Sequence, residues 1–283
     1  MNEKIYVPST SEVITPNDLL SYDAIYCNGN ILANDPEIEG AHIHSCCEVY
    51  VNISGNVSFV VENNLYPISS GDVLITRPNE VHHCICHEDC IHEHYCVWIN
   101  AGGKLLSMLD CFFDRNNGES NLIVMSESDK KLLLEYLSKF CVEKGKVNRC
   151  DPEALSGFFG LLQLLEKYRK NTVPAKKLPD AFENILRYID DHFDEGFSIG
   201  EIADEFFLSR SALCHMFKKY LSLSPSKYIE AKKLARSKQM LEEGESVQNV
   251  CYACGFSDCS YFVSVFKKYF KITPYKYGKQ SRQ

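Results

Sequence analysis

Histidine and carboxylate side chains with metal-ligand spacing stand near the start of this chain, and seven of its nine histidines lie in the first hundred residues. His42 and His44 alternate, so on a strand both imidazoles face one side. Glu48, with either His82 or His83, would complete a donor set suited to a divalent transition metal. The competing interpretation is a pocket for a sugar or other small ligand without metal, because His82 and His83 cannot both point inward from one strand.

A second concentration follows directly, because residues 82–98 hold five histidines and four cysteines. If the chain forms a hairpin that turns near residues 87–89, alternate side chains share a face and could bind zinc or a softer metal. The residues in question are Cys84, Cys86, Cys90, His92, His94 and Cys96. Within these residues no zinc-finger spacing is present, and no Cys-x-x-Cys at a helix start supports a redox role. The alternative is a two-stranded ribbon whose small cysteines face the core while its histidines face water.

These residues must be positioned by strands. From about residue 20 to residue 100 the chain has short apolar runs, such as VYVNI, VSFVV and DVLIT, which clusters of Gly, Asn and Ser separate. That pattern is typical of a sandwich or a small barrel.

The same region resembles the cupin domain. The run GAHIHSCCEVYVNISG has the spacing of the first cupin motif, and Gly71-Asp72 with Pro78 and a following histidine resembles the second. The resemblance implies a cupin-like, ligand-sensing domain over residues 1–110.

Helices are predicted between this region and the rest of the chain. Residues 105–113, 129–144 and 151–170 read as amphipathic helices, and the last has a stripe formed by Leu155, Phe158, Phe159, Leu162 and Leu165. Asp151 and Pro152 suit its first turn. We assign residues 111–170 to a packing or dimerisation segment. Residues 171–180, with two prolines, are the predicted linker.

The strongest pattern is a repeat in the last hundred residues. Phe217-Lys218-Lys219-Tyr220 returns 49 residues later as Phe266-Lys267-Lys268-Tyr269. Such a repeat indicates one supersecondary unit used twice. Before each copy the chain reads as helix, turn and helix: Ser198 and Glu201 form a capping box, Ser209 begins the next helix, and Gly255 suits the second turn. Two helix-turn-helix units indicate a DNA-binding domain over residues 181–283.

The helical period separates buried from exposed positions in each second helix. The predicted outward residues of the first unit are Arg210, Ser211, Cys214, His215, Lys218 and Lys219. Those of the second unit are Cys259, Ser260, Val263, Ser264, Lys267 and Lys268. We expect the lysines to bind phosphate and the others to lie at base edges or nearby phosphates. Because the second set lacks bidentate donors, we predict that the first unit sets most of the specificity.

From about residue 182 to residue 280 the chain resembles the DNA-binding domain of the AraC/XylS family of bacterial transcriptional regulators. The stretch that carries the resemblance is SVQNVCYACGFSDCSYFVSVFKKYFKITPYKY. The family's fold implies seven helices, with a linker helix near residues 226–241 that holds two reading heads against successive major grooves. The glycine that usually follows each Phe-Lys-Lys is Ser222 in one copy and Lys271 in the other. Residues with a Cβ adopt the left-handed conformation at a helix end less readily than glycine does.

Charge agrees with this division. The net charge is −8, but residues 1–180 hold 15 Lys and Arg against 25 Asp and Glu (15 − 25 = −10), whereas residues 209–283 hold 14 against 5 (14 − 5 = +9). The basic end supplies salt-sensitive attraction to phosphate.

No apolar run of about 20 residues could span a bilayer, and the first residues lack the apolar run of a signal peptide. We therefore expect a cytoplasmic protein whose 14 cysteines are free thiols or metal ligands.

Together these patterns predict a multi-domain α+β protein with an N-terminal cupin-like barrel or sandwich plus helices and a C-terminal all-α domain. We expect a ligand-responsive transcriptional regulator, an activator on family resemblance, and no enzyme. Its expected partners are double-stranded DNA, a small effector such as a sugar or metabolite, RNA polymerase and a second copy of the chain. It requires no cofactor, although the cupin domain could hold a divalent metal. The alternatives are a metal or redox sensor that uses the His/Cys cluster and a metal-dependent cupin enzyme.

Overall fold

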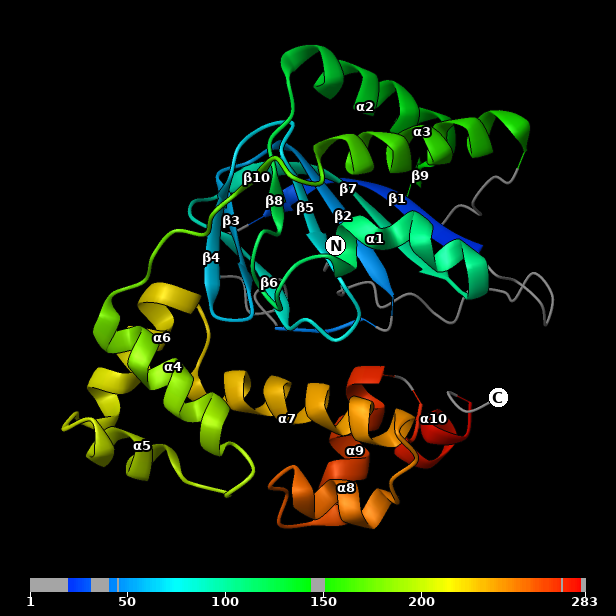
Figure 1. Cartoon of the computed structure of the whole chain (residues 1–283). Helices are drawn as coiled ribbons and strands as arrows, with labels where there is room; N and C mark the ends of the chain where they lie inside the picture. Colours follow the sequence, from blue (N-terminus) through cyan, green and yellow to red (C-terminus); the bar gives the residue numbers. More distant parts are fainter. Residues whose placement is uncertain (1–19, 32–40, 45, 144–150, 271, 281–283) are drawn as a thin grey trace.

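The computed structural model describes residues 20–31, 41–44, 46–143, 151–270 and 272–280. A β-sandwich with two covering helices forms one part, and a group of helices held together by one long helix forms the other (Figure 1). The predicted α+β class, with strands first and an all-helical second half, is confirmed. Among the described residues no helix is both long and apolar enough to cross a membrane.

The sandwich consists of two sheets. The larger has the strand order β10-β8-β5-β2-β7-β1-β9, and the smaller has the order β4-β3-β6. The strand bounds are β1 Leu20–Ile31, β2 Cys47–Ser54, β3 Val57–Val61, β4 Asn64–Ile68, β5 Val73–Thr76, β6 His82–Cys86, β7 Cys90–Ala101, β8 Leu122–Ile123, β9 Val142–Glu143 and β10 Thr172–Val173.

The predicted turn near residues 87–89 is present, but the prediction that β6 and β7 pair as a hairpin is wrong. β6 pairs with β3 in the small sheet, whereas β7 pairs with β1 and β2 in the large sheet. The turn therefore leads the chain from one sheet to the other. Since the two strands face each other across the interior instead of pairing edge to edge, there is no two-stranded ribbon.

Strand register arranges the interior of the sandwich in rows. Trp98, Glu48 and Thr76 are direct partners across β7, β2 and β5, so their side chains share one face. Cys96, Tyr50 and Leu74 form the next row. The apolar members of these rows meet Val57, Phe59 and Val61 of the small sheet in one core.

The opposite face of the large sheet packs on helices. A short 3-10 segment (Gly103–Leu109) leads into α1 (Asp110–Phe113), and α2 (Glu127–Phe140) and α3 (Pro152–Tyr168) then cover the sheet. Asp151 accepts a hydrogen bond from the Ala154 N–H, which confirms the predicted cap of α3. The predicted stripe is partly wrong, because Phe158 is fully buried whereas Phe159 is 42% exposed.

The second half contains seven described helices, as the family resemblance implies. They are α4 Asp180–His192, α5 Ile199–Glu205, α6 Arg210–Leu221, α7 Pro225–Glu242, α8 Val247–Ala253, α9 Cys259–Phe270 and α10 Pro274–Gln280. The capping box at Ser198 and Glu201 is present, and Ser209 caps α6. Gly255 takes φ +70° at the second turn, and Ser222 takes φ +52° at the end of α6. Lys271 lies outside the described residues.

The small sheet joins the two halves. Its outward side chains, which include Val60 and Ile85, share one buried cluster with Phe182 of α4, Leu213 of α6 and Tyr228 of α7. The second helix-turn-helix unit has a separate core around Phe262 and Phe266. The first unit is therefore docked on the sandwich through apolar contact, and α7 carries the second.

Residues 171–179 connect α3 with α4 and follow the sandwich. β10 pairs with β8, and the Lys176 N–H donates to the Leu65 carbonyl at 2.7 Å. Only residues 177–179 separate this last backbone bond from the start of α4.

Two adjacent phenylalanines test the packing of α3. Phe158→Ala should lower the free energy of unfolding by about 3–5 kcal/mol, because the fully buried ring stacks on Tyr22 at a centroid distance of 4.3 Å. Phe159→Ala, measured at a protein concentration at which the chain is monomeric, is the matched control and should cost less than about 1 kcal/mol. Urea denaturation measures both values, and equal losses would contradict this packing.

Candidate functional site

The first reading helix, α6, presents the predicted polar face to solvent. Arg210, Ser211, Cys214, His215, Lys218 and Lys219 are all exposed. Leu213 and Phe217 are buried on the opposite side, and Met216 and Tyr220 are half-buried. The Arg210 guanidinium occupies the space that a Cβ at Gly200 would need, so this arginine also packs on α5.

The second reading helix, α9, presents a less polar face. Ser260, Ser264, Lys267 and Lys268 are exposed, whereas Cys259 and Val263 are half-buried against the core of the second unit. The Tyr261 N–H donates to the Asp258 carboxylate at 2.6 Å, which satisfies one amide of the first turn. The exposed polar face is therefore narrower than that of α6.

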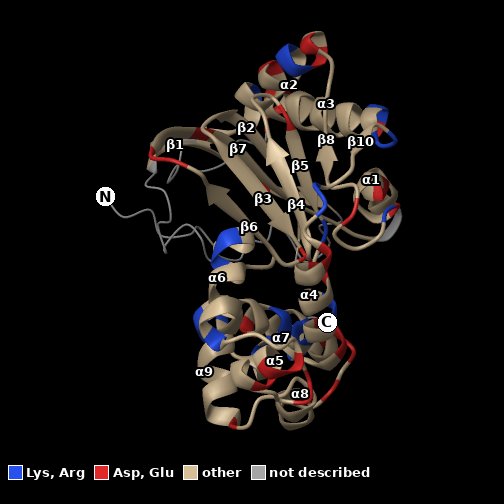
Figure 2. Cartoon of the chain, turned by 90° about the vertical axis from the view of Figure 1, so that its left-hand side faces the viewer, with Lys and Arg blue, Asp and Glu red and all other residues tan. Residues whose placement is uncertain are grey.

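The two reading helices lie near opposite ends of α7 (Figure 1) and on the same side of the helical domain when the molecule is turned (Figure 2). Figure 2 shows Lys and Arg segments near both of them. α6 and α9 each carry two lysines in the last turn, where the helix dipole favours positive charge.

The structure brings together His42, His44, Glu48 and His82. One ligand atom of each lies within 4.8 Å of the others. The His82 Nε2 and Glu48 Oε2 atoms are 2.8 Å apart, and His44 Nε2 lies 3.2 Å from the same oxygen. Among the described residues, these four side chains form the group of three or more potential metal ligands that the fold brings together.

The protonation states follow from the hydrogen bonds. His82 Nδ1 donates to the Glu80 carbonyl and His82 Nε2 donates to Glu48, so the ring is an imidazolium. Burial alone would lower the pKa of His82, but Glu48 raises it above its ordinary value. Burial would likewise raise the pKa of Glu48, but the two imidazoles hold it well below its usual range. Burial lowers the pKa of His44, although the Glu48 carboxylate, 3.2 Å from its Nε2, acts in the opposite direction.

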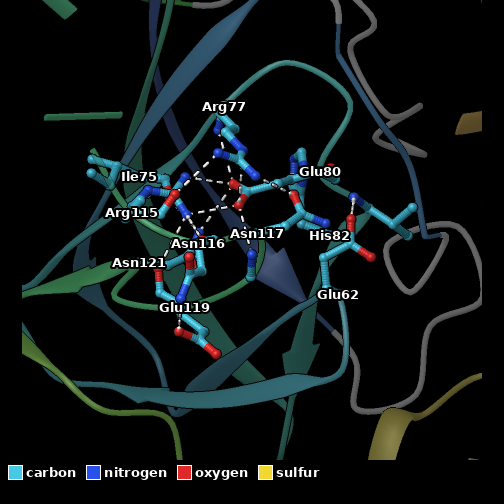
Figure 3. Close-up of polar contacts among 12 residues, drawn as sticks. Glu62, Ile75, Arg77, Glu80, His82, Arg115, Asn116, Asn117, Glu119 and Asn121 are labelled. Carbon is cyan, nitrogen blue, oxygen red and sulfur yellow. Dashed lines mark hydrogen bonds and ion pairs between the residues drawn. The ribbon is translucent and has the colours of Figure 1, made fainter. Parts of the chain in front are cut away.

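A buried carboxylate network holds the segment that presents His82 (Figure 3). Glu80 is fully buried and receives both terminal guanidinium nitrogens of Arg115, at 2.7 and 2.6 Å. It also accepts from the backbone N–H groups of Arg77 and Gly118 and from Asn121. These bonds hold the pKa of Glu80 below its usual range despite burial. Sequence reasoning missed this network, since nothing in the spacing of Glu80 and Arg115 pairs them.

His83 points the other way and does not join the cluster. Its Nε2 donates to the Leu221 carbonyl at the end of α6, at 2.6 Å. The choice between His82 and His83 that the sequence left open is thus resolved in favour of His82. Strand alternation predicted that one of the two would face outward, but it could not identify the α6 carbonyl as the partner.

The Cys/His set of residues 84–96 faces the interior without forming a second cluster of metal-type ligands among the described residues. A hydrogen bond with Cys86, together with burial, raises the pKa of Cys84, and burial raises the pKa of Cys96. His92 is buried and bonded to the Tyr50 hydroxyl at 2.6 Å, so the idea that the histidines face water is wrong for this residue. In the absence of a metal, these shifts keep the Cys84 and Cys96 thiols protonated and therefore weakly nucleophilic.

A polar cluster between the two halves was also missed. Lys232 of α7 forms ion pairs with Glu62 and, at 3.0 Å, with Asp190 of α4. Asn63 donates to Asp190 at 2.6 Å and accepts from the Tyr228 hydroxyl. The signal was weak, because each of these residues reads as an ordinary surface position in its own element.

The His83 contact should make stability depend on pH. Burial lowers the pKa of His83 from 6.5 to about 4, so the unfolded chain takes up a proton that the folded chain refuses. The contribution of His83 to the free energy of unfolding is fully present above pH 6.5. It is lost as the pH falls toward 4, by up to roughly 3 kcal/mol. Urea unfolding at a series of pH values measures the slope. His83→Gln keeps a donor without a titrating ring and should reduce that slope, to which buried His44 and His92 also contribute. An unchanged slope would refute the assignment.

Comparisons with known proteins agree with both halves. The family model described as "AraC-like ligand binding domain" matches residues 31–107, and the one described as "Helix-turn-helix domain" matches residues 202–280. The HTH-type transcriptional activator RhaR of Mannheimia succiniciproducens is 23% identical over 238 residues, which cover 83% of this chain and 86% of the relative. RhaS of Escherichia fergusonii is 31% identical over 116 residues, 40% of this chain and 42% of the relative.

Solved structures include one-domain and two-domain matches. The C-terminal domain of the response regulator YesN from Fusobacterium nucleatum is 28% identical with a TM-score of 0.34, and the match covers 35% of this chain and 99% of that one. ToxT from Vibrio cholerae is 16% identical with a TM-score of 0.37, and the match covers 93% of this chain and 98% of that one.

Proposed function

Because the chain belongs to the AraC/XylS family of transcriptional regulators, we propose that it binds a target duplex with α6 and α9 and that a small polar effector in the sandwich controls this binding. The observation that carries the proposal is the pair of helix-turn-helix units whose polar, lysine-ended faces are both exposed while the apolar faces are buried. Such a surface fits the charged backbone and grooves of DNA.

The residues of α6 and α9 have different proposed roles. Ser211, Cys214 and His215 are the candidates for base contact in the first unit, and Arg210 reaches phosphate or a base edge beside α5. In the second unit Ser260 and Ser264 are exposed, and half-buried Val263 offers a methyl surface to thymine. The first unit is therefore proposed to set most of the specificity.

Polar atoms inside the sandwich indicate the chemistry of the effector. The buried Thr76 Oγ1 and His92 Nδ1 atoms have no hydrogen-bond partner among the described residues, and His44 Nε2 faces the Glu48 carboxylate at 3.2 Å. Buried polar groups normally find partners, so these atoms favour a ligand with several hydroxyl or carbonyl groups. A sugar or a similarly polar metabolite has that chemistry.

A divalent transition metal is the second candidate effector. His42, His44, Glu48 and His82 offer three imidazoles and a carboxylate within reach of one ion, and the residues therefore fit such a group. A bound ion would supply the positive charge that the His82 proton now supplies beside Glu48. We assign no catalytic step to it.

Further proposals concern location and assembly. The protein acts in the cytoplasm, where its target DNA lies, and activates transcription through RNA polymerase, as the family resemblance implies. Dimerisation is proposed through α2 and α3, where Leu134 and Phe159 expose apolar surface.

Substitutions in the reading helices test the DNA-binding mode. With duplexes selected from a random pool, Arg210→Ala or His215→Ala should relax base preference by about 5- to 150-fold, the range for a lost base contact. Lys267→Ala should weaken binding to all sequences and reduce the salt slope by about 1. Gel-shift titrations at several salt concentrations measure both effects.

The matched comparison is Ser264→Ala in α9. If it relaxed base preference more than Arg210→Ala, the proposed division of roles between the two units would be wrong. If the full chain retained no duplex in a salt-dependent way, the whole DNA-binding proposal would fail.

A thermal-shift screen distinguishes the two effector candidates. A sugar, metabolite or metal that binds only the folded chain at about 100 times its Kd should stabilise it by about 2.7 kcal/mol. For a divalent metal, Glu48→Gln should abolish the shift, whereas His83→Gln, outside the cluster, should retain it. Elemental analysis of protein purified without chelators checks occupancy. A metal-induced shift that survives Glu48→Gln would rule out this cluster as the site.

A further inference from the structure

Two adjacent histidines at the start of β6 face opposite sides of the small sheet. His82 and His83 are each 1% exposed. His82 turns into the sandwich and bonds to Glu48, whereas His83 turns out toward the helical half. A single peptide unit therefore separates the proposed effector site from the first reading unit.

The His83 contact reaches the end of the reading helix itself. Leu221 is the last residue of α6, and its carbonyl is one of those that a helix leaves without an internal partner. Since a carbonyl can only accept, His83 Nε2 must carry the proton, and the ring is the neutral tautomer. The bond is 2.6 Å long and its donor is fully enclosed, so it fixes where α6 ends relative to β6.

The residue before the histidine pair is tied to the helical half as well. The Val81 N–H donates to Glu62 Oε1 at 2.9 Å, and the Glu62 N–H donates to the Val81 carbonyl at 2.7 Å. Glu62 also forms the ion pair with Lys232 of α7. Residues 81 and 83 thus connect to two different helices of the DNA-binding half, while residue 82 between them faces the interior.

The matched position in the second unit is built differently. By the 49-residue offset, Leu221 corresponds to Phe270 at the end of α9. Phe270 packs on Phe266 and Tyr277, lies over the ammonium of Lys238, and also packs against the buried cluster that joins the two halves. The middle of α9, around Phe262 and Val265, packs in the separate core of the second unit and therefore serves as an internal control for the end of α6.

From this geometry we propose that His83 is a positioning residue for the first reading helix. His83 transmits a change at His82 and Glu48 to the orientation of α6. The proposal rests on the proposed function, because it concerns the regulation of the same effector site. Any ligand that displaces Glu48 from His82 moves that imidazole, and the shared backbone carries the movement to His83. The second reading helix contacts the junction through α7 and through Phe270 at its end.

Hydrogen exchange of the full chain tests the coupling without DNA and without an identified effector. Glu48→Gln replaces the charged acceptor of His82 and is the perturbation. The readout is the exchange rate of the backbone amides of residues 219–222, and residues 262–265 in the middle of α9 are the control. In the otherwise unchanged protein, Glu48→Gln should speed exchange at the end of α6 by about tenfold, as for the loss of one buried hydrogen bond, and leave residues 262–265 unchanged.

The same perturbation is then repeated in the His83→Leu and His83→Gln backgrounds. His83→Leu has no donor, so Glu48→Gln should have no further effect at the end of α6. His83→Gln keeps a donor and should restore part of the response. If His83→Leu does not fold, this second variant still tests the proposal. A purely structural role for His83 would leave the response to Glu48→Gln the same in every background. That result, or no response in any background, overturns the proposal.

The proposed function fails separately. Salt-dependent retention of a duplex depends on the exposed faces of α6 and α9, whereas the exchange experiment depends on the buried contacts of His82 with Glu48 and of His83 with the Leu221 carbonyl. Loss of the coupling with DNA binding intact would refute only the role of His83. An intact coupling without duplex retention would refute the DNA-binding proposal and leave the contact between the two halves in place.

Discussion

Burial of the small sheet on both faces is the constraint from which the rest of this structure follows. One face of β4-β3-β6 closes the sandwich, and the other shares a core with α4, α6 and α7. A strand buried on both sides cannot alternate apolar with polar residues in the usual way. β6, with the sequence HHCIC, accordingly contains two buried histidines, and each requires a polar partner. Glu48 satisfies one and the Leu221 carbonyl satisfies the other.

The same constraint explains why so much charge is enclosed near the junction. Glu80 with Arg115, and Glu62 with Lys232, are buried or half-buried pairs, and removing one partner of such a pair leaves an unpaired charge in a low-dielectric environment. These pairs specify one arrangement of the 77–82 segment instead of adding much to stability. The proposed effector site is thus built on a segment that has few alternative conformations.

Local patterns predicted the helical half well. The capping box at Ser198, the cap at Ser209 and the repeat of Phe-Lys-Lys-Tyr describe interactions within a few residues, and the helices begin where these residues indicate. The same holds for His42 and His44, whose alternation placed both rings on one side. The metal-type cluster could therefore be predicted, apart from the choice between His82 and His83.

Long-range partners could not be predicted. Periodicity shows that a face is apolar, but it does not show which element covers it, and so Phe159 was assigned to the buried stripe of α3 although it is exposed. The assignment of β6 and β7 to one hairpin failed for the same reason, because the spacing of a turn does not reveal that the chain changes sheets there. The bond from His83 to Leu221 joins residues 138 positions apart, and only the docked structure reveals it.

The path of residues 171–179 along the sandwich limits how far the first helix-turn-helix unit can move. Since the Lys176 N–H is bonded to Leu65, only residues 177–179 act as a tether, and three extended residues reach about 10 Å. While that bond persists, the first unit can tilt on the small sheet but cannot move far from it into solvent. Under the proposed function, switching then consists of small rotations of the first unit, which change how the two units meet successive grooves and leave the overall dimensions of the protein nearly constant.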